Sequence, residues 1–192
     1  RCSGGCLWND HGHFPAIPQE RGKPKTPPLA SELSVGELQA GKAGIKAATY
    51  YGCMLLRPFE DIGIDKAESP TIFEDLLRAL GAEPVEFANK IECCGAHLAM
   101  NNEEVVTNLS GKVMTSAVDA GAELIVTTCP LCQFNLEKSQ PRVAESDTGY
   151  APVPVVYFTQ ALGLALGQDI ETLGFEKNTS DIMPLLKKKG IA

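Results

Sequence analysis

The chain has 192 residues, of which 44% are hydrophobic, and it carries a net charge of −7 with a pI near 5.0. This length suits one domain with appendages, and the apolar content is sufficient for a buried core. An acidic chain argues against nucleic-acid binding, which requires a basic face. No apolar stretch reaches the roughly 20 residues that span a bilayer, and no signal-peptide pattern opens the chain, so we expect no transmembrane segment and no leader.

The segment 1–44 is predicted to be irregular, because its many prolines and glycines prevent a long helix or an interior strand. It contains Cys2 and Cys6, followed by His11 and His13, which are candidate ligands for a metal of their own. Their spacing fits no strong zinc pattern, and ordinary loop thiols are the alternative interpretation.

From Ile45 onward, strand-like and helix-like segments alternate. Apolar runs predict strands at 45–51, 84–87, 124–128 and 153–157. Predicted helices run from Ser69-Pro70 to Gly81, from a cap at Asn101 or Asn102 to Gly121, over 133–139 and over 158–166. We therefore expect an irregular segment 1–44, an α/β domain over 45–167 and a partly extended tail over 168–192.

Strands that alternate with helices predict a small open parallel sheet, Rossmann-like, with flanking helices. In such sheets, ligands bind beyond the carboxyl ends of the strands. Five cysteines of the chain follow predicted strands and are therefore expected at that edge.

Seven cysteines are present, and five of them follow predicted strands in the pattern C-x39-C-C-G-x33-C-P-L-C. They are Cys53, Cys93, Cys94, Cys129 and Cys132. An odd total and a chain of this length argue against a disulfide scaffold and favour a reducing cytoplasm. Five thiols at one sheet edge instead indicate a site for a thiophilic metal.

Thiolate ligands select zinc, copper(I) or iron–sulfur clusters. A structural zinc site and a cubane cluster each use four ligands. The fifth cysteine therefore indicates either a spare nucleophilic thiol or a cluster that is larger or less regular than a cubane. Zinc stays open as the alternative metal.

Residues near the cysteines are secondary candidates. Gly95 is expected to let the backbone wrap closely around a cluster, and Pro130 to rigidify the turn between two ligands. His97 is a candidate for proton transfer and Arg57 for binding an anion or a neighbouring subunit. Met100 is expected to pack rather than bind metal, and Tyr50 and Tyr51 to fill space at a strand end, with a hydroxyl group near the cluster as the alternative.

Four segments together resemble the B subunit of heterodisulfide reductase, and more narrowly the second of its two cysteine-rich CCG domains. These segments are Tyr50-Tyr51-Gly52-Cys53-Met54-Leu55-Leu56-Arg57-Pro58, Cys93-Cys94-Gly95-Ala96, Cys129-Pro130-Leu131-Cys132-Gln133-Phe134-Asn135-Leu136 and Val155-Val156-Tyr157-Phe158-Thr159-Gln160. The resemblance covers roughly residues 45–166.

The resemblance implies a non-cubane 4Fe-4S cluster bound by Cys53, Cys93, Cys94, Cys129 and Cys132, with Gly95 in the binding loop and Cys53, Cys93, Cys94 and His97 as catalytic candidates. It also implies a small disulfide substrate that is reduced in successive one-electron steps, or a small thiol that is oxidised in the reverse direction. Electrons would arrive from a ferredoxin-like iron–sulfur subunit that a flavin subunit feeds.

The chain departs from this family in having one complete CCG motif where the family's protein has two. Cys2 and Cys6 are separated by three residues, whereas the family's cysteine pair is separated by two. We therefore expect an oxidoreductase subunit whose activity requires partner chains. The alternatives are a cluster-bearing subunit of a succinate or glycolate dehydrogenase-type complex, including a membrane-anchoring or quinone-reactive one, and a zinc-binding structural module.

Overall fold

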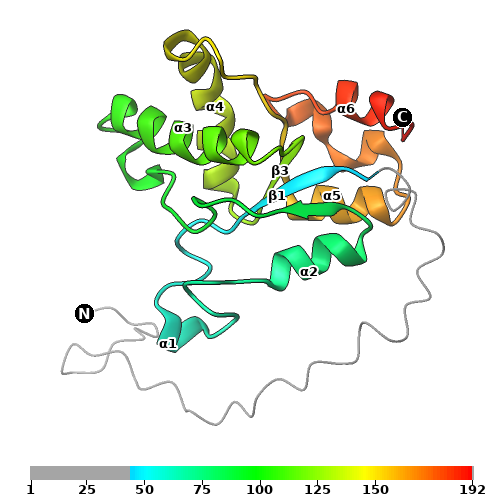
Figure 1. The fold of residues 1–192 in the computed structure, drawn as a ribbon, viewed down its shortest axis with the longest axis horizontal. Helices are drawn as coiled ribbons and strands as arrows, with labels where there is room; N and C mark the ends of the chain where they lie inside the picture. The colour runs from blue at the N-terminus through cyan, green and yellow to red at the C-terminus, as the bar shows by residue number, and fades with distance from the viewer. Residues whose placement is uncertain (1–43, 192) are drawn as a thin grey trace, which may run out of the picture. The chain divides into compact units, whose positions relative to one another are not determined.

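A computed structural model of the protein describes residues 44–191, and its centre is a four-stranded parallel sheet (Figure 1). The strands are β1 (Lys46–Tyr50), β2 (Glu83–Val85), β3 (Leu124–Thr127) and β4 (Val155–Tyr157), in the order β2-β1-β3-β4. In register, Ala48 lies opposite Val85, and Tyr50 lies opposite Thr127. The predicted open parallel α/β sheet is confirmed. The predicted irregular segment 1–44, with Cys2, Cys6, His11 and His13, lies outside the described residues except for Gly44.

Helices connect and cover these strands. They are α1 (Phe59–Ile62), α2 (Ile72–Ala79), α3 (Glu103–Asp119), α4 (Pro130–Ser146), α5 (Phe158–Ala165) and α6 (Met183–Lys188), with short 3-10 turns η2 (Ala96–Leu98), η3 (Ile170–Leu173) and η4 (Phe175–Lys177).

Each face of the sheet buries its own core, because alternate residues of a strand point to opposite faces. On one face Ala47, Val126 and Val156 pack with side chains of α2, α5 and α6. On the other face Ala48, Ile125 and Val155 pack with side chains of α3 and α4. Figure 1 shows α3 and α4 on one side of the sheet and α2 and α5 on the other.

The N-terminal ends of the helices differ in how well the sequence predicts them. Asn102 caps α3 as predicted, since its side chain accepts a hydrogen bond from the Val105 amide at 3.1 Å. The predicted start of α2 is Ser69-Pro70, but the helix begins at Ile72. Asp65 replaces a local cap there, because its carboxylate accepts hydrogen bonds from the Thr71 and Ile72 amides at 2.6 and 2.8 Å.

The helix predicted over 133–139 is longer and starts earlier. It begins at Pro130, directly after Cys129, so Cys132 lies in its first turn. Proline is well suited to the first helical position, because the amide that it lacks has no partner within the helix. Pro130 therefore starts a helix instead of stiffening a loop.

Residues 168–191, expected to be a partly extended tail, fold into η3, η4 and α6. Ile182 and Leu186 are buried in the core with Phe175. Full burial of one such side chain stabilises the fold by about 1.5–3 kcal/mol. This part of the chain is therefore part of the α/β domain.

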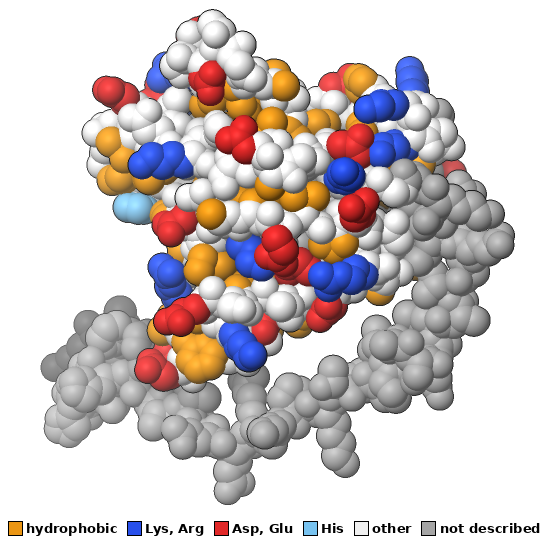
Figure 2. All heavy atoms as spheres, in the orientation of Figure 1, with side chains coloured by type: hydrophobic (Ala, Val, Ile, Leu, Met, Phe, Trp, Pro, Cys, Tyr) orange, Lys and Arg blue, Asp and Glu red, His pale blue; other side chains and the backbone are white. Residues whose placement is uncertain are grey.

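In residues 44–191 there is no helix with the length and apolar character that crossing a membrane demands. On the face drawn in Figure 2, acidic and basic side chains are interspersed, with hydrophobic side chains between them.

Candidate metal centre

The five cysteines all lie in loops or helix starts at the carboxyl edge of the sheet. Cys53 follows β1, Cys93 and Cys94 follow β2 after an irregular segment, and Cys129 and Cys132 follow β3. The chain places β2 on one side of β1 and β3 on the other, so the strand order reverses at β1. Ligand sites of open α/β sheets form at such reversals. The fold therefore gathers the thiols where such proteins bind ligands.

The five thiols are free, and four of them form two close pairs. The Sγ atoms of Cys53 and Cys93 are 3.8 Å apart, and those of Cys94 and Cys132 are 3.4 Å apart. Cys94 and Cys132 are buried, whereas Cys53, Cys93 and Cys129 are partly exposed. The site thus has an inner pair beside the core and an outer pair facing solvent, with Cys129 as the fifth thiol.

Hydrogen bonds polarise the inner pair. The hydrogen-bonded contact between Cys94 Sγ and Cys132 Sγ, together with the Asn135 amide at 3.6 Å from Cys94 Sγ, lowers the pKa of Cys94 to about 6. The same contact and burial raise the pKa of Cys132. The lowered pKa favours the thiolate form of Cys94, which is the form that binds metals.

Within residues 44–191, no three His, Cys, Asp or Glu side chains converge as ligands of a single metal ion. Tetrahedral ligands with Zn–S bonds of about 2.3 Å lie roughly 3.8 Å from one another. Here such short separations occur within each thiol pair. Two pairs and a fifth thiol suit a group with several metal atoms, to which different pairs bind, better than one zinc ion.

Two glycines fit the backbone around the thiols. Gly52 has a φ of +66°, and a Cβ atom there would lie 3.0 Å from Cys132 Sγ. Gly95 has a φ of +79°, and its Cβ would meet Leu109 Cδ1 at 3.0 Å. Gly52 therefore allows the backbone to pass close to the Cys132 thiol, and Gly95 allows it to pass close to α3, while the role expected for Gly95 at a cluster stays a prediction.

Polar groups beside the thiols are able to donate hydrogen bonds to a cluster. The Gly95 amide donates to Cys93 Sγ at 3.3 Å. The hydroxyl oxygen of Thr128, next to Cys129, is the one buried side-chain nitrogen or oxygen atom in residues 44–191 without a hydrogen-bond partner. A buried hydroxyl without a partner is costly, and cluster sulfur would supply the missing acceptor.

The other candidates from the sequence lie at different distances from this site. His97 Nδ1 is 4.0 Å from Cys93 Sγ, and Arg57 is exposed. Tyr50 lies close enough to the thiols that they add to the effect of burial in raising the pKa of its hydroxyl. Met100 is 96% exposed, so the expectation that it packs is wrong.

Sequence reasoning missed three residues that support the site. Asn135 follows Cys132 by three positions, a helical spacing that is a usable signal. Tyr157 donates a hydrogen bond to the Thr128 carbonyl at 2.9 Å and so ties β4 to the loop of Cys129. Glu74 is fully buried in α2, and nothing local in the sequence indicates this.

Comparison with known proteins agrees with the position of the thiols. Residues 47–137, which include all five cysteines, match the family model of the cysteine-rich CCG domain. The chain is 35% identical over 143 residues to the 8-methylmenaquinol:fumarate reductase membrane anchor subunit of Wolinella succinogenes, covering 74% of this chain and 50% of that protein.

Two subunits of archaeal reductases are similar to a comparable degree. The B subunit of the ferredoxin:CoB-CoM heterodisulfide reductase of Methanosarcina mazei is 35% identical over 148 residues, covering 75% of this chain and 49% of that protein. The B subunit of the ferredoxin/F420H2-dependent CoB-CoM heterodisulfide reductase of Methanosarcina acetivorans is 33% identical over 147 residues, with the same two shares. The chain spans about half the length of the curated relatives it matches.

Proposed function

Because this chain belongs to the family of cysteine-rich CCG proteins that includes the B subunit of heterodisulfide reductase, we propose that it is an iron–sulfur oxidoreductase subunit. Cys53, Cys93, Cys94, Cys129 and Cys132 together bind one non-cubane 4Fe-4S cluster. The competing hypothesis is that the same thiols bind zinc and that the chain is a structural module.

The observation that carries this proposal is the grouping of the sulfur atoms. Two pairs, with Sγ separations of 3.8 and 3.4 Å, and a fifth thiol provide more ligands than one zinc ion or one cubane uses. The unpartnered Thr128 hydroxyl beside Cys129 offers a donor to an inorganic sulfide. Such outer hydrogen bonds tune the reduction potential of a cluster.

When bound, the cluster supplies one-electron transfer, and two electrons and two protons convert a disulfide into two thiols. The protein residues divide the remaining work. The buried pair Cys94 and Cys132, with Asn135, holds the inner side in a site of low polarity. The partly exposed Cys53 and Cys93 face the substrate side, where His97 Nδ1, 4.0 Å from Cys93 Sγ, is placed to transfer a proton.

We further propose that this polypeptide acts in a complex. A ferredoxin-like iron–sulfur subunit and a flavin subunit would deliver electrons, and a small disulfide or thiol would be the substrate. The free thiols of the described residues suit a reducing cytoplasm.

A separate observation, 35% identity to a fumarate reductase membrane anchor subunit, favours a second candidate, a cluster-bearing subunit of a quinol-linked dicarboxylate oxidoreductase.

Anaerobic metal and sulfide analysis, with EPR of the oxidised protein, tests the assignment. About four iron and four sulfide per chain are expected for one 4Fe-4S cluster, with an oxidised-state signal that Cys94→Ser removes. One zinc per chain, with no sulfide and no reducible centre, would replace the proposal by a structural module. Titrating the loaded protein with a small disulfide and with a quinol then separates the two redox candidates, because only the productive acceptor or donor changes the cluster signal.

A further inference from the structure

A buried charge lies in α2, away from the thiols. The carboxylate of Glu74 is fully buried, in a helix whose other buried residue, Leu77, is apolar. It accepts hydrogen bonds from the hydroxyl groups of Thr49, at 2.6 Å, and Tyr51, and from Lys90 Nζ at 2.8 Å. Burial alone would raise the pKa of Glu74, but these hydrogen bonds hold it below its usual value.

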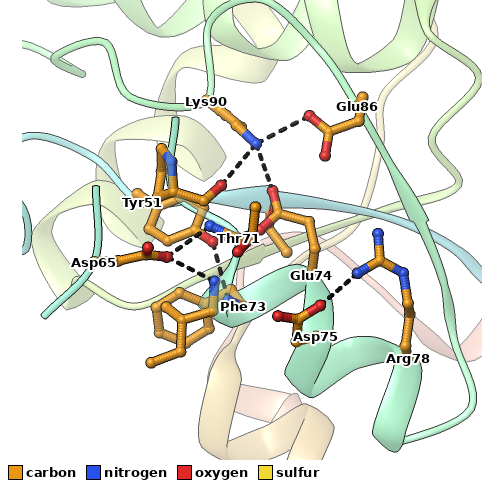
Figure 3. A network of polar contacts seen from close by, with 12 residues as sticks. Tyr51, Asp65, Thr71, Phe73, Glu74, Asp75, Arg78, Glu86 and Lys90 are labelled. Carbon is orange, nitrogen blue, oxygen red and sulfur yellow. Dashed lines mark hydrogen bonds and ion pairs between the residues drawn. The ribbon is translucent and has the colours of Figure 1, made fainter. Parts of the chain in front are cut away.

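Lys90 connects this carboxylate to the loop that precedes Cys93. Its amino group also donates to the Pro70 carbonyl at 3.0 Å and to Glu86 at 2.9 Å, so three acceptors surround it (Figure 3). Its own backbone carbonyl accepts a hydrogen bond from the Tyr51 amide at 2.9 Å. Lys90 is therefore held through its side chain by Glu74 of α2 and through its backbone carbonyl by Tyr51, two residues before Cys53.

The two tyrosines at the end of β1 hold the same loop from both faces of the sheet. The Tyr50 hydroxyl donates to the Glu92 carbonyl at 2.8 Å, immediately before Cys93. Tyr51 donates through its amide to Lys90 and through its hydroxyl to Glu74. One strand end thus fixes the segment 90–92, and the same strand end leads directly into Gly52 and Cys53.

We propose that Glu74 and Lys90 are positioning residues for the outer thiol pair: their ion pair locks the loop before Cys93 against the end of β1 and so sets the separation of Cys53 and Cys93. The consequence for a cluster rests on the function proposed above, whereas the effect on the loop does not. Neither residue touches a thiol; both act through Tyr51 and the backbone.

The chemistry of the pair supports a positioning role. Replacing a buried ion pair by apolar side chains of similar volume is often neutral or stabilising, so stability alone is a weak reason for a charge in this core. Hydrogen bonds to charged groups are directional and relatively strong, and a fully satisfied network specifies one geometry. The network here joins α2, β1 and the loop of Cys93, which lie far apart in the sequence.

The test compares Lys90→Met with Lys90→Arg and with a matched control. The control is Arg78→Met, which removes the exposed Asp75–Arg78 ion pair. This pair lies on α2, as Glu74 does, but is separate from the loop before Cys93 (Figure 3). In the metal-free chain, amide hydrogen exchange of residues 90–95 is expected to accelerate roughly tenfold or more in Lys90→Met, the factor for one lost charge-assisted hydrogen bond. Lys90→Arg is expected to restore slow exchange, and Arg78→Met to leave it unchanged.

The loaded protein provides the readout that a merely structural residue would not move. We expect the g values of the oxidised cluster to change in Lys90→Met, to recover in Lys90→Arg and to stay unchanged in Arg78→Met. Unchanged exchange and unchanged g values in a folded Lys90→Met protein would overturn the inference. If Lys90→Met does not fold, Glu74→Gln takes its place with the same criteria. Absence of a cluster from the unaltered protein would contradict the proposed function instead, while the exchange result would still decide the loop's dependence on Lys90.

Discussion

Gly52 offers the sharpest test of how the backbone approaches the thiols. An L-residue at its φ of +66° costs about 1–2 kcal/mol, because Cβ crowds the following carbonyl. In addition, the new Cβ of Gly52→Ala would lie 3.0 Å from Cys132 Sγ, which packs against Cys94 Sγ at 3.4 Å. Overpacking of this kind costs about 1–3 kcal/mol. The sum predicts that Gly52→Ala destabilises the protein by about 2–5 kcal/mol.

Gly174→Ala is the matched control, since Gly174 has a φ of +68° and nothing lies within 4 Å of its ideal Cβ. It carries only the conformational cost, about 1–2 kcal/mol. Urea denaturation of the two variants and of the unaltered chain, all metal-free and reduced, gives both free energies of unfolding. The predicted excess for Gly52→Ala is about 1–3 kcal/mol. Equal destabilisation by the two substitutions would refute the claim that Gly52 is required by the Cys132 thiol.

Three further outcomes are expected. The pKa of Glu74 is lowered from its ordinary value of 4.5, so its ionised form stabilises the fold above that value, and this contribution is lost as pH falls from there through the lower pKa of the folded state. A urea-midpoint series from about pH 7 to about pH 3 should therefore show a shallower loss in Glu74→Gln than in the unaltered chain, and parallel curves would contradict this. Leu186→Ala should cost about 2–5 kcal/mol in the same assay, because Leu186 is fully buried, whereas a cost near zero would show that the C-terminal part does not belong to the core. Asn135→Leu removes the donor to Cys94 Sγ and should lower the cluster's reduction potential, measured by an EPR-monitored titration, since such hydrogen bonds stabilise added negative charge; an unchanged potential would argue against a role for Asn135.

The sequence is informative wherever a local pattern carries the structure. The apolar run before Gly52 predicts β1. Asn102 at the start of α3 and Gly121 just after its end predict the limits of that helix. The cysteines follow predicted strands, and parallel strands place their carboxyl ends at one edge. The same cysteines, with the residues beside them, also carry the resemblance to the cysteine-rich CCG domain.

Other features depend on partners distant in the sequence. Glu74 belongs to α2, where a charged residue is ordinarily assigned to the solvent side, and its buried carboxylate is satisfied by Thr49, Tyr51 and Lys90, which all lie at least 16 residues away. Ile72, an apolar residue at the start of that helix, is 43% exposed. Leu186 falls in a predicted tail, because a short segment near three lysines carries no clear helical pattern. Tertiary packing decides each of these cases.

The central claim is that all five thiols bind a single cluster, and a series of single cysteine variants tests it most directly. Each of Cys53, Cys93, Cys94, Cys129 and Cys132 is changed to serine, and the oxidised EPR spectrum and the iron content are measured after identical anaerobic reconstitution. We predict that every one of the five substitutions alters the spectrum or lowers the iron content. A variant with an unchanged spectrum and full iron content would show that four cysteines suffice and would contradict the five-thiolate cluster.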